Sequence, residues 1–256
     1  MILDRFRLDG KVAIVTGAGR GLGEGAVLAF AEMGADVVCA ARTLEQIEAT
    51  AEKARSHGTR ALAVPCDVTD TAQLENVASQ AMKEFGRIDV LVNNAGGTPP
   101  RPALDTSEQM FDAAFHFNVT SAFLLSRMAI PHMLAGDGGS IVNISSAAGR
   151  MPQANFVAYG TAKAALTFMT RQLACEFAPK VRVNAIAVGA VKTSALMPFL
   201  SEDLEAKMSS LTPMARIGEV EDISIMALYL ASPASAWVTG KIMEVDGGTE
   251  STNWPF

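Results

Sequence analysis

The segment "KVAIVTGAGRGLGEGAVLAFAEMG", residues 11–34, decides the fold, because it reads as a strand, a glycine-rich loop and a helix in succession. Its glycines allow a tight turn and close approach to a phosphate, and the free amides at the start of the following helix attract negative charge. The spacing of Gly17, Gly21 and Gly23 follows T-G-x-x-x-G-x-G rather than G-x-G-x-x-G. A glycine-rich turn without a ligand is the alternative, but the strand before and the helix after the loop favour dinucleotide binding.

Further short apolar runs follow at intervals along the chain, separated by segments with helical spacing such as residues 44–57 and 71–85. The runs cover residues 11–16, 35–40, 60–65, 88–93, 140–145, 181–188 and 241–245. Alternating strands and helices predict a Rossmann-like, doubly wound parallel sheet of about seven strands with helices on both faces. No linker or internal repeat divides the chain, so we expect a single domain over residues 1–256.

The composition excludes several classes of partner. A net charge of -6 and a pI near 5.2, with scattered Lys and Arg, argue against nucleic-acid binding. Cys39, Cys66 and Cys175 lie far apart in apolar surroundings, which predicts buried free thiols in a reducing compartment and no metal site. The N-terminus lacks the apolar core of a signal peptide, and the charge-free run 223–240 is interrupted by "SPAS". We therefore expect a cytoplasmic protein without a membrane span.

The stretch "AYGTAKAAL", residues 158–166, places a tyrosine and a lysine at i, i+4 on a predicted helix. Tyr159 and Lys163 therefore emerge from one face and can act on one object. For this stretch alone, an amphipathic helix with both polar tips in water is the more probable interpretation. Ser146, at the end of the predicted strand 140–145, and Ser145 beside it can both reach the same cleft. Asn118 is expected within a helix, where asparagine is a poor helix former and needs a structural reason.

Together these ordered motifs resemble the short-chain dehydrogenase/reductase family, in its single-domain form, over roughly residues 8–248. The resemblance implies that the glycine loop holds the cofactor pyrophosphate, that "NNAG" (93–96) supports its adenosine side, and that Asp67 contacts adenine. The family pattern of serine, two residues and glycine selects Ser146 over Ser145. It also implies a catalytic set of Asn118, Ser146, Tyr159 and Lys163, with Asn118 shaping its helix and holding a water behind the lysine.

In that family Tyr159 moves a proton on the substrate oxygen while a hydride moves between the nicotinamide and the carbonyl carbon. A phenol of pKa about 10 needs a fall of about three units to work near neutrality. We expect Lys163 to supply much of this fall, since a nearby cation shifts a pKa by about 1 to 3 units, and the oxidised nicotinamide to supply more. Ser146 is expected to hydrogen-bond the substrate oxygen.

The expected cofactor-binding residues follow from the same motifs. After the sixth strand Val188 stands where the family commonly has proline, so we expect a less rigid grip on the nicotinamide carboxamide. The full set of expected cofactor-binding residues is Gly17, Gly19, Arg20, Gly21, Leu22, Gly23, Arg42, Asp67, Val68, Asn94, Ala95, Gly96, Tyr159, Lys163, Gly189, Val191 and Thr193.

The cofactor is predicted to be NADP rather than NAD. Enzymes that use NAD place an acidic residue at the end of the second strand, whereas here Ala41 is followed by Arg42. Asp36 begins that strand and lies at the wrong end of the sheet. Arg42 can form paired hydrogen bonds with a 2'-phosphate, and Arg20 adds a second cation. A solvated arginine at a helix start is the alternative.

The substrate is less well defined. Residues 190–216 are rich in Met and Leu and correspond to the family's mobile lid, which suits a bulky apolar ligand, while packing against another subunit is an equal alternative. "RLDGKVAIVTGAG", "NNAGGTPPRP" and "SPASAWVTG" resemble bacterial 7α-hydroxysteroid dehydrogenases, which implies a sterol-like alcohol or ketone. Reduction of 3-oxoacyl groups on a carrier protein is the second candidate, and a regulator that binds NADP without turnover is a third.

Predicted helices at 107–134 and 155–177 are apolar on more than one face, which suggests burial against another subunit, and the resemblance implies a homotetramer built on them.

Overall fold

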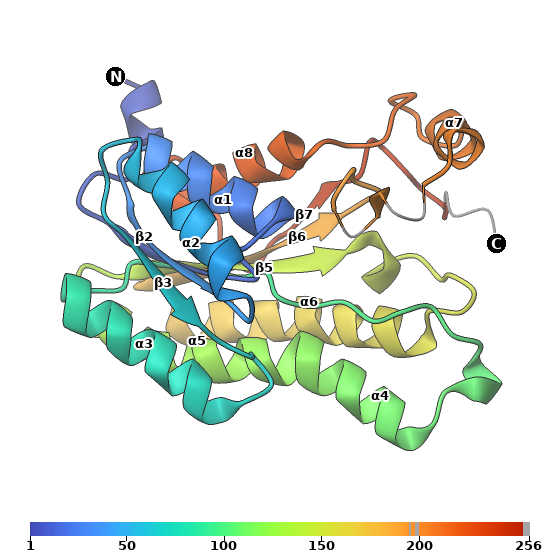
Figure 1. Cartoon of the computed structure of the whole chain (residues 1–256), viewed down its shortest axis with the longest axis horizontal. Coiled ribbons are helices and arrows are strands. Elements are labelled where there is room, and N and C mark those ends of the chain that lie inside the picture. The colour runs from blue at the N-terminus through green and yellow to red at the C-terminus, as the bar shows by residue number, and fades with distance from the viewer. Residues whose placement is uncertain (195, 198–199, 253–256) are drawn as a thin grey trace.

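The apolar runs of the sequence form one parallel sheet of seven strands within residues 1–194, 196–197 and 200–252, which this computed structural model describes (Figure 1). The strands are β1 (Val12–Thr16), β2 (Asp36–Ala41), β3 (Ala61–Pro65), β4 (Val90–Asn93), β5 (Gly139–Ser146), β6 (Val181–Val188) and β7 (Ile242–Val245). The helices are α1 (Gly21–Glu32), α2 (Leu44–Arg55), α3 (Thr71–Phe85), α4 (Glu108–Phe115), α5 (Ser121–Ala135), α6 (Val157–Phe177), α7 (Glu202–Ser210) and α8 (Val220–Ala231). The predicted fold class is confirmed.

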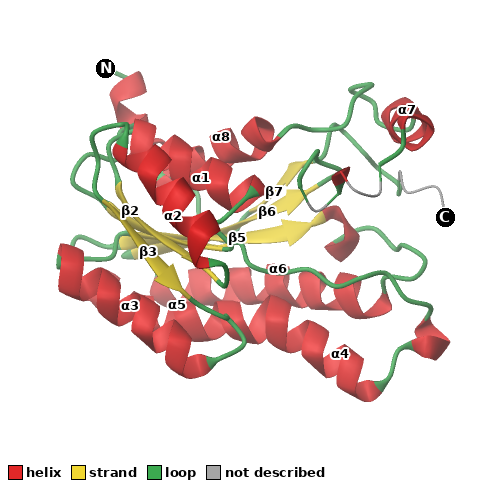
Figure 2. Ribbon diagram, viewed as in Figure 1, coloured by secondary structure: helices red, strands yellow, loops and turns green. Residues whose placement is uncertain are grey.

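The strand order is β3-β2-β1-β4-β5-β6-β7, with every neighbouring pair parallel. Helices α1, α2 and α8 lie on one face of the sheet, and α3, α5 and α6 lie on the other (Figure 2). The direction of winding reverses between β1 and β4, and sheets of this order bind ligands beyond the carboxyl ends of the strands at that switch point. The topology alone thus places a site beside the loops after β1 and β4.

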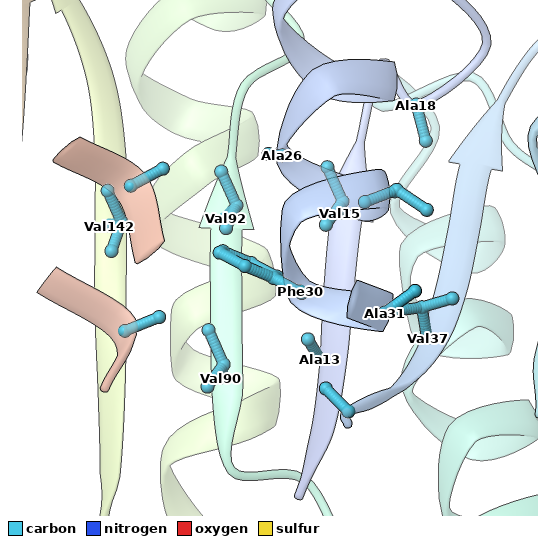
Figure 3. Packing of buried hydrophobic residues seen from close by; sticks show 14 of the residues in the cluster. Ala13, Val15, Ala18, Ala26, Phe30, Ala31, Val37, Val90, Val92 and Val142 are labelled. Atoms are coloured by element: carbon cyan, nitrogen blue, oxygen red, sulfur yellow. The ribbon is translucent and has the colours of Figure 1, made fainter. Parts of the chain in front are cut away.

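The core is divided into two layers by the sheet. On the α1 side, Phe30 is fully buried over the middle of the sheet, with Ala13 of β1 and Val90 and Val92 of β4 around its ring (Figure 3). On the other side, α3 buries Leu74, Val77, Ala78 and Ala81, which share one helical face. Burial of one such large side chain contributes about 1.5–3 kcal/mol, so both helices are held mainly by packing.

The predicted helix 107–134 proves to be three segments. A π-helical stretch, His116–Thr120, lies between α4 and α5. Single-turn π segments of this kind concentrate at functional sites. The stretch contains Asn118, so the residue that was expected in the middle of a regular helix lies instead in a local irregularity of it.

The prediction of three buried thiols is wrong for one of them. Cys39 and Cys66 are buried, but Cys175 is exposed. The cause is the orientation of α6: its sheet-facing side carries Leu166, Thr170 and Leu173, and position 175 faces away from the sheet. As for membranes, the helices that the structure describes include none long and apolar enough to cross a bilayer.

Candidate active site

A cleft of about 480 Å³ opens at the carboxyl ends of the strands, at the predicted switch point. Its walls come from the loops that follow β1, β2, β3, β4 and β6, from the end of β5, and from the start of α6. Helix α7 and the starts of α4 and α6 lie at the same end of the molecule (Figure 1). Residues distant in sequence therefore converge here because every parallel strand delivers its following loop to this edge.

The loop after β1 requires glycine at positions with a left-handed backbone and at a close contact between α1 and the loop. Gly17 and Gly21 have φ values of +65° and +56°, in the left-handed region that favours glycine. A Cβ on Gly23 would lie 2.2 Å from the Gly17 carbonyl oxygen. Gly23 thus lets α1 pack directly against the loop, and it lies behind the cleft rather than in its wall. Gly17, Gly19, Arg20, Gly21 and Leu22 do line the cleft.

The loops after β1 and β4 are tied together by hydrogen bonds at the switch point. The Thr16 hydroxyl accepts from the backbone amides of Asn94 and Ala95, each at 3.0 Å. The Asn94 side-chain amide donates to the Thr16 carbonyl at 2.8 Å. Asn94, Ala95 and Gly96 all line the cleft. The "NNAG" stretch is therefore a rigid wall fixed to β1.

The far end of the cleft is bounded by Ala41, Arg42, Asp67 and Val68. The carboxylate of Asp67 accepts from the amide and hydroxyl of Thr69, which lowers its pKa, and Arg42 lowers that pKa further. Asp36, at the opposite end of β2, forms a salt bridge with Arg60 at 2.6 Å. The carboxyl end of β2 thus presents a cation and no carboxylate from Asp36, as the sequence predicts.

Ser146, Tyr159 and Lys163 meet at the other end of the cleft. The Ser146 side chain lies close enough to Tyr159 to lower its pKa, and its oxygen accepts from the Ala148 amide at 3.2 Å. The Ser145 hydroxyl donates instead to the Lys163 carbonyl at 3.1 Å. Ser145 is thereby occupied by the helix backbone. The structure separates the two serines in the way the family pattern implies, and Ser146 is the one directed at the tyrosine.

The expected effect of Lys163 on Tyr159 is wrong for the protein's own groups. Burial raises the pKa of Tyr159 above its ordinary 10.0, and the hydrogen bond with Ser146 opposes this. The Lys163 ammonium lies 5.7 Å from the tyrosine ring centroid and donates to the Ile144 carbonyl at 2.8 Å. Burial also lowers the pKa of Lys163 to about 8. Desolvation is thus the largest influence on the pKa of both groups.

Asn118 lies behind this cluster and does not line the cleft. It accepts a hydrogen bond from the Gly97 amide at 2.8 Å and donates to the Ala114 carbonyl at 2.9 Å. A Cβ on Gly96 would lie 2.8 Å from Oδ1 of Asn118 and 3.0 Å from Nζ of Lys163. The asparagine, the lysine and the "NNAG" wall therefore converge on one point.

Gly149 completes the serine pattern for a steric reason. A Cβ there would lie 2.8 Å from the Lys163 carbonyl carbon and 2.9 Å from the Ala164 nitrogen. The turn that follows Ser146 consequently packs directly on the backbone of α6, at the residue that carries the lysine. A side chain at position 149 would separate the serine from the helix.

In the wall after β6, one of the three predicted cofactor-binding residues does not line the cleft. Val188 pairs in register with Ser146 of β5 and with Val245 of β7, so the backbone is held on both sides. Gly189 and Thr193 line the cleft, but Val191 is buried and bridges to Gly218.

Some residues that line the cleft were not predicted from the sequence; they include Thr43, Gln46, Cys66, Phe117 and Ser194. Thr43, Gln46 and Cys66 lie near Arg42 or Asp67 in the sequence, which is the signal that could have found them.

The expected lid segment begins after this wall. Met208 of α7 is fully buried, whereas Met197, Leu211 and Met214 are exposed. Phe199, which the sequence singles out, lies outside the described residues. The ammonium of Lys192 contacts Glu205 of α7 at 2.5 Å. Helix α7 therefore has a buried methionine and an ion pair that hold it, and the chain on either side of the helix carries exposed apolar side chains.

The arrangement provides a dinucleotide-sized cleft with a hydroxyl pair and a buried amine at one end. Among the described residues, no group of three or more His, Cys, Asp or Glu side chains could hold a metal ion.

Comparisons with known proteins agree with this chemistry. A family model described as enoyl-(acyl carrier protein) reductase matches residues 17–250. An uncharacterised oxidoreductase of Mycobacterium tuberculosis is 49% identical over 99% of this chain and 97% of its own length. The 7α-hydroxysteroid dehydrogenase of Escherichia coli K12 is 39% identical, with 96% of each chain covered. A solved structure of 7α-hydroxysteroid dehydrogenase complexed with NADH and 7-oxo glycochenodeoxycholic acid superposes with a TM-score of 0.93 at 39% identity, covering 96% of this chain and 97% of that one.

Proposed function

The chain belongs to the short-chain dehydrogenase/reductase family and is an NAD(P)-dependent oxidoreductase, and from this premise we propose that it interconverts a bulky apolar secondary alcohol and its ketone using NADP. The observation that carries the proposal is the convergence of Ser146, Tyr159 and the buried amine of Lys163 at one end of a cleft that is also lined by the glycine loop.

The residues of the cleft fit a nicotinamide dinucleotide. The left-handed backbone at Gly17 and Gly21 and the start of α1 form a concave cradle for a pyrophosphate, which Arg20 borders. We propose that the residues predicted from the sequence and lining the cleft hold the cofactor, with Gly23 and Val191 supporting it from behind. When bound, the cofactor supplies or accepts the hydride.

In the direction of reduction, the Tyr159 hydroxyl donates its proton to the substrate oxygen as the carbonyl carbon gains a hydride and becomes an alcohol. The Ser146 hydroxyl hydrogen-bonds the same oxygen and stabilises its developing charge. The Lys163 ammonium lies 5.7 Å from the centre of the phenol ring, and Asn118 accepts from the amide of Gly97, which directly follows the "NNAG" wall. In oxidation the same groups remove the proton, so the pKa of Tyr159 must fall from its raised value when substrate and cofactor are in place.

The preference for NADP rests on charge at the end of β2. Arg42 lines the cleft there, and no acidic residue occupies position 41. A guanidinium forms paired, charge-assisted hydrogen bonds with a phosphate, whereas ribose hydroxyls are better matched by a carboxylate.

The substrate class rests on the lid and on the relatives. We propose that residues 190–216 form a lid over the substrate within a single domain, because exposed Met197, Leu211 and Met214 offer adaptable apolar contact. The 39% identity to 7α-hydroxysteroid dehydrogenase supports a hydroxysteroid or another bulky apolar ligand. We propose a cytoplasmic location because the cysteines are free, as is usual in a reducing compartment.

The experiment is a panel of ketones and alcohols, including sterol-like compounds and a 3-oxoacyl carrier thioester, assayed with NADPH and NADH by absorbance of the reduced nicotinamide. We expect turnover of bulky ketones with NADPH. Tyr159→Phe should abolish that turnover and leave NADPH affinity within about twofold, because only the transferable proton is lost. Substantial turnover by Tyr159→Phe would contradict the mechanism. Turnover of the thioester alone would favour 3-oxoacyl reduction, and NADPH binding without any turnover would favour a regulator.

A further inference from the structure

Ser145 takes part in a pair of hydrogen bonds that joins the end of β5 to α6. Its hydroxyl donates to the Lys163 carbonyl at 3.1 Å, and the Lys163 ammonium donates back to the carbonyl of Ile144 at 2.8 Å. Ser145 and Lys163 are 2% and 3% exposed, so water does not compete for either bond. We call this reciprocal pair of hydrogen bonds the clasp.

The clasp lies between the two groups that the proposed reaction must align. On β5 it is adjacent in sequence to Ser146, and on α6 it is one helical turn beyond Tyr159. Gly149 brings the turn after Ser146 into direct contact with the α6 backbone at the same residue, Lys163. A shift of α6 along the strand would therefore move Tyr159 relative to Ser146, and the clasp opposes that shift.

A second contact holds α6 to β5 further from the site. The Asn143 side-chain amide donates to the Thr170 hydroxyl at 2.9 Å, and both residues are fully buried. Thr170 lies about two turns beyond Lys163 on the same helix. Helix α6 thus remains docked through Asn143 when Ser145 is changed, and the effect of such a change is confined to the end that carries Tyr159.

We propose that Ser145 is a positioning residue: through the clasp it sets the separation and orientation of Ser146 and Tyr159. The inference rests on the proposed function, because it assigns to Ser145 the alignment of the two hydroxyls that the reaction uses. It also explains why two serines stand side by side at the end of β5, one directed at the tyrosine and one at the helix backbone.

Ser140 offers a matched control on the same strand. Its hydroxyl donates to the Leu230 carbonyl of α8 at 2.7 Å, and like Ser145 it is 2% exposed. Ser140→Ala removes the same kind of bond, from a buried serine to a helix carbonyl, at the opposite end of β5. Both alanine variants should lower the Tm by a similar few degrees, as loss of one buried bond does in a chain of this size.

The kinetic experiment compares the two variants with the wild type on a substrate identified by the panel. Ser145→Ala should lower kcat by about tenfold to hundredfold while the Kd for NADPH stays within about twofold, because a small misplacement of reacting groups slows chemistry far more than binding. Ser140→Ala should retain the kcat of the wild type. Equal kcat values for the two variants would overturn the proposal.

A spectroscopic readout needs no substrate. The chain has two tyrosines, Tyr159 and Tyr229, so in a Tyr229→Phe background the near-ultraviolet absorbance of tyrosinate reports Tyr159 alone. The charged group beside that phenol is Lys163, while Arg20, Arg42 and Asp67 line the cleft from the loops after β1, β2 and β3. Ser145→Ala should move the titration of Tyr159 to higher pH, because it weakens the bond with Ser146 that lowers the tyrosine's pKa. Ser140→Ala should leave the titration in place, and an identical titration in both variants would contradict the clasp.

Two further variants keep the outcomes distinct. If Ser145→Ala does not fold, Ser145→Cys preserves the side-chain shape with a much weaker donor, and it should change kcat and the titration in the same direction. A Ser145→Cys protein with wild-type kcat and titration would overturn the proposal. If Tyr159→Phe retains turnover, the proposed function fails, while the titration still decides whether Ser145 positions Tyr159.

Discussion

Burial of the Lys163 amine lowers the free energy of unfolding of the protein. The side chain is almost completely buried, it donates to a backbone carbonyl, and burial lowers its pKa from 10.5 to about 8. At pH 7 the amine is protonated in both the folded and the unfolded chain, so the charge must be desolvated on folding. A shift of this size corresponds to about 3 kcal/mol against the folded state. The position of Lys163 beside Tyr159 therefore serves the proposed reaction and destabilises the folded state.

The stability of the protein should consequently depend on pH through Lys163. Between about pH 8 and pH 10.5 the unfolded lysine holds its proton more often than the folded one, so the free energy of unfolding should rise with pH. Lys163→Met should remove this rise and be more stable than the wild type at pH 7. Chemical denaturation over a pH series measures both effects.

The buried thiols do not obscure this comparison. Burial raises the pKa of Cys39 to about 12 and of Cys66 to about 11, which makes stability fall with pH above the usual thiol value, but both thiols are present in both proteins. The difference between the two curves therefore isolates Lys163. Exposed Lys180 provides the control: Lys180→Met should keep the wild-type curve. A Lys163→Met protein with the same pH dependence as the wild type would refute the assignment.

Arg42 is the residue on which cofactor choice depends. If it makes charge-assisted hydrogen bonds to a 2'-phosphate, each contributes about 1.5 to 3 kcal/mol. Arg42→Ala should weaken NADPH binding by roughly tenfold to a hundredfold and leave NADH binding almost unchanged, and adding Ala41→Asp should move the preference further towards NADH. Titration of both reduced cofactors measures this.

Arg55, at the other end of α2, is the matched control for Arg42. Its guanidinium donates to Glu52 and to the Ala61 carbonyl, away from the cleft. Arg55→Ala should alter neither affinity. A wild type that prefers NADH, or an Arg42→Ala variant that loses both cofactors equally, would show that Arg42 serves another purpose.

At the scale of elements, α7 differs from the other helices in how it is held. Met208 is buried and the Lys192–Glu205 ion pair fixes one side, but α7 lies off the end of the sheet and not against one of its faces (Figure 1). An exposed ion pair contributes about 0–1 kcal/mol, so the attachment is modest. We propose that α7 adapts to ligands of different size without disturbing the sheet.

The lid proposal is tested with Met197, which is exposed beside the cleft wall. Met197→Ala should raise KM for large apolar substrates several-fold, change it little for small ones, and retain kcat, because the contact is made equally in ground and transition states. Steady-state kinetics with a large and a small ketone measure this. Equal effects on both ketones would instead indicate that the segment packs against another subunit.

At the scale of the whole molecule, α5 and α6 leave large apolar side chains in water. Phe123 and Leu134 of α5 are exposed, and Phe168 of α6 is 58% exposed. Ile225 of α8 and Trp237 form further exposed apolar positions. We propose that these side chains lie in subunit contacts of the homotetramer that the family resemblance implies, because apolar side chains exposed together mark protein interfaces.

Phe168→Asp tests this assembly. A carboxylate in an apolar contact between helices has a high desolvation cost, so the variant should sediment as a smaller species at concentrations where the wild type is a tetramer. Leu104→Asp, at a fully exposed position outside α5 and α6, should leave the wild-type assembly intact. Sedimentation equilibrium distinguishes the species, and a wild type that is monomeric at micromolar concentration would contradict the proposal.

Much of this architecture could be predicted from the sequence because its causes are local. The apolar runs and the helical spacing fix which segments are strands and helices, and parallel pairing then brings the loops of β1 and β4 to one edge. The glycine loop, Arg42 and the Tyr159–Lys163 pair follow from short-range spacing, so the walls of the cleft were predictable to that extent. Phe117 was not, because no local sequence pattern marks a side chain of another segment that faces the cleft.

Other properties were decided by contacts between distant segments. The sequence could place Ser145 and Ser146 at a strand end, but only the packing of α6 on β5 directs one hydroxyl to Tyr159 and the other to the Lys163 carbonyl. The exposure of Cys175 depends on how α6 is rotated against the sheet. The raised pKa of Tyr159 likewise depends on burial, which is a property of the assembled fold. Residue types and spacing determine which chemistry is available. The desolvation of a group and the orientation of its side chain arise from tertiary packing, because both depend on what surrounds the group in space.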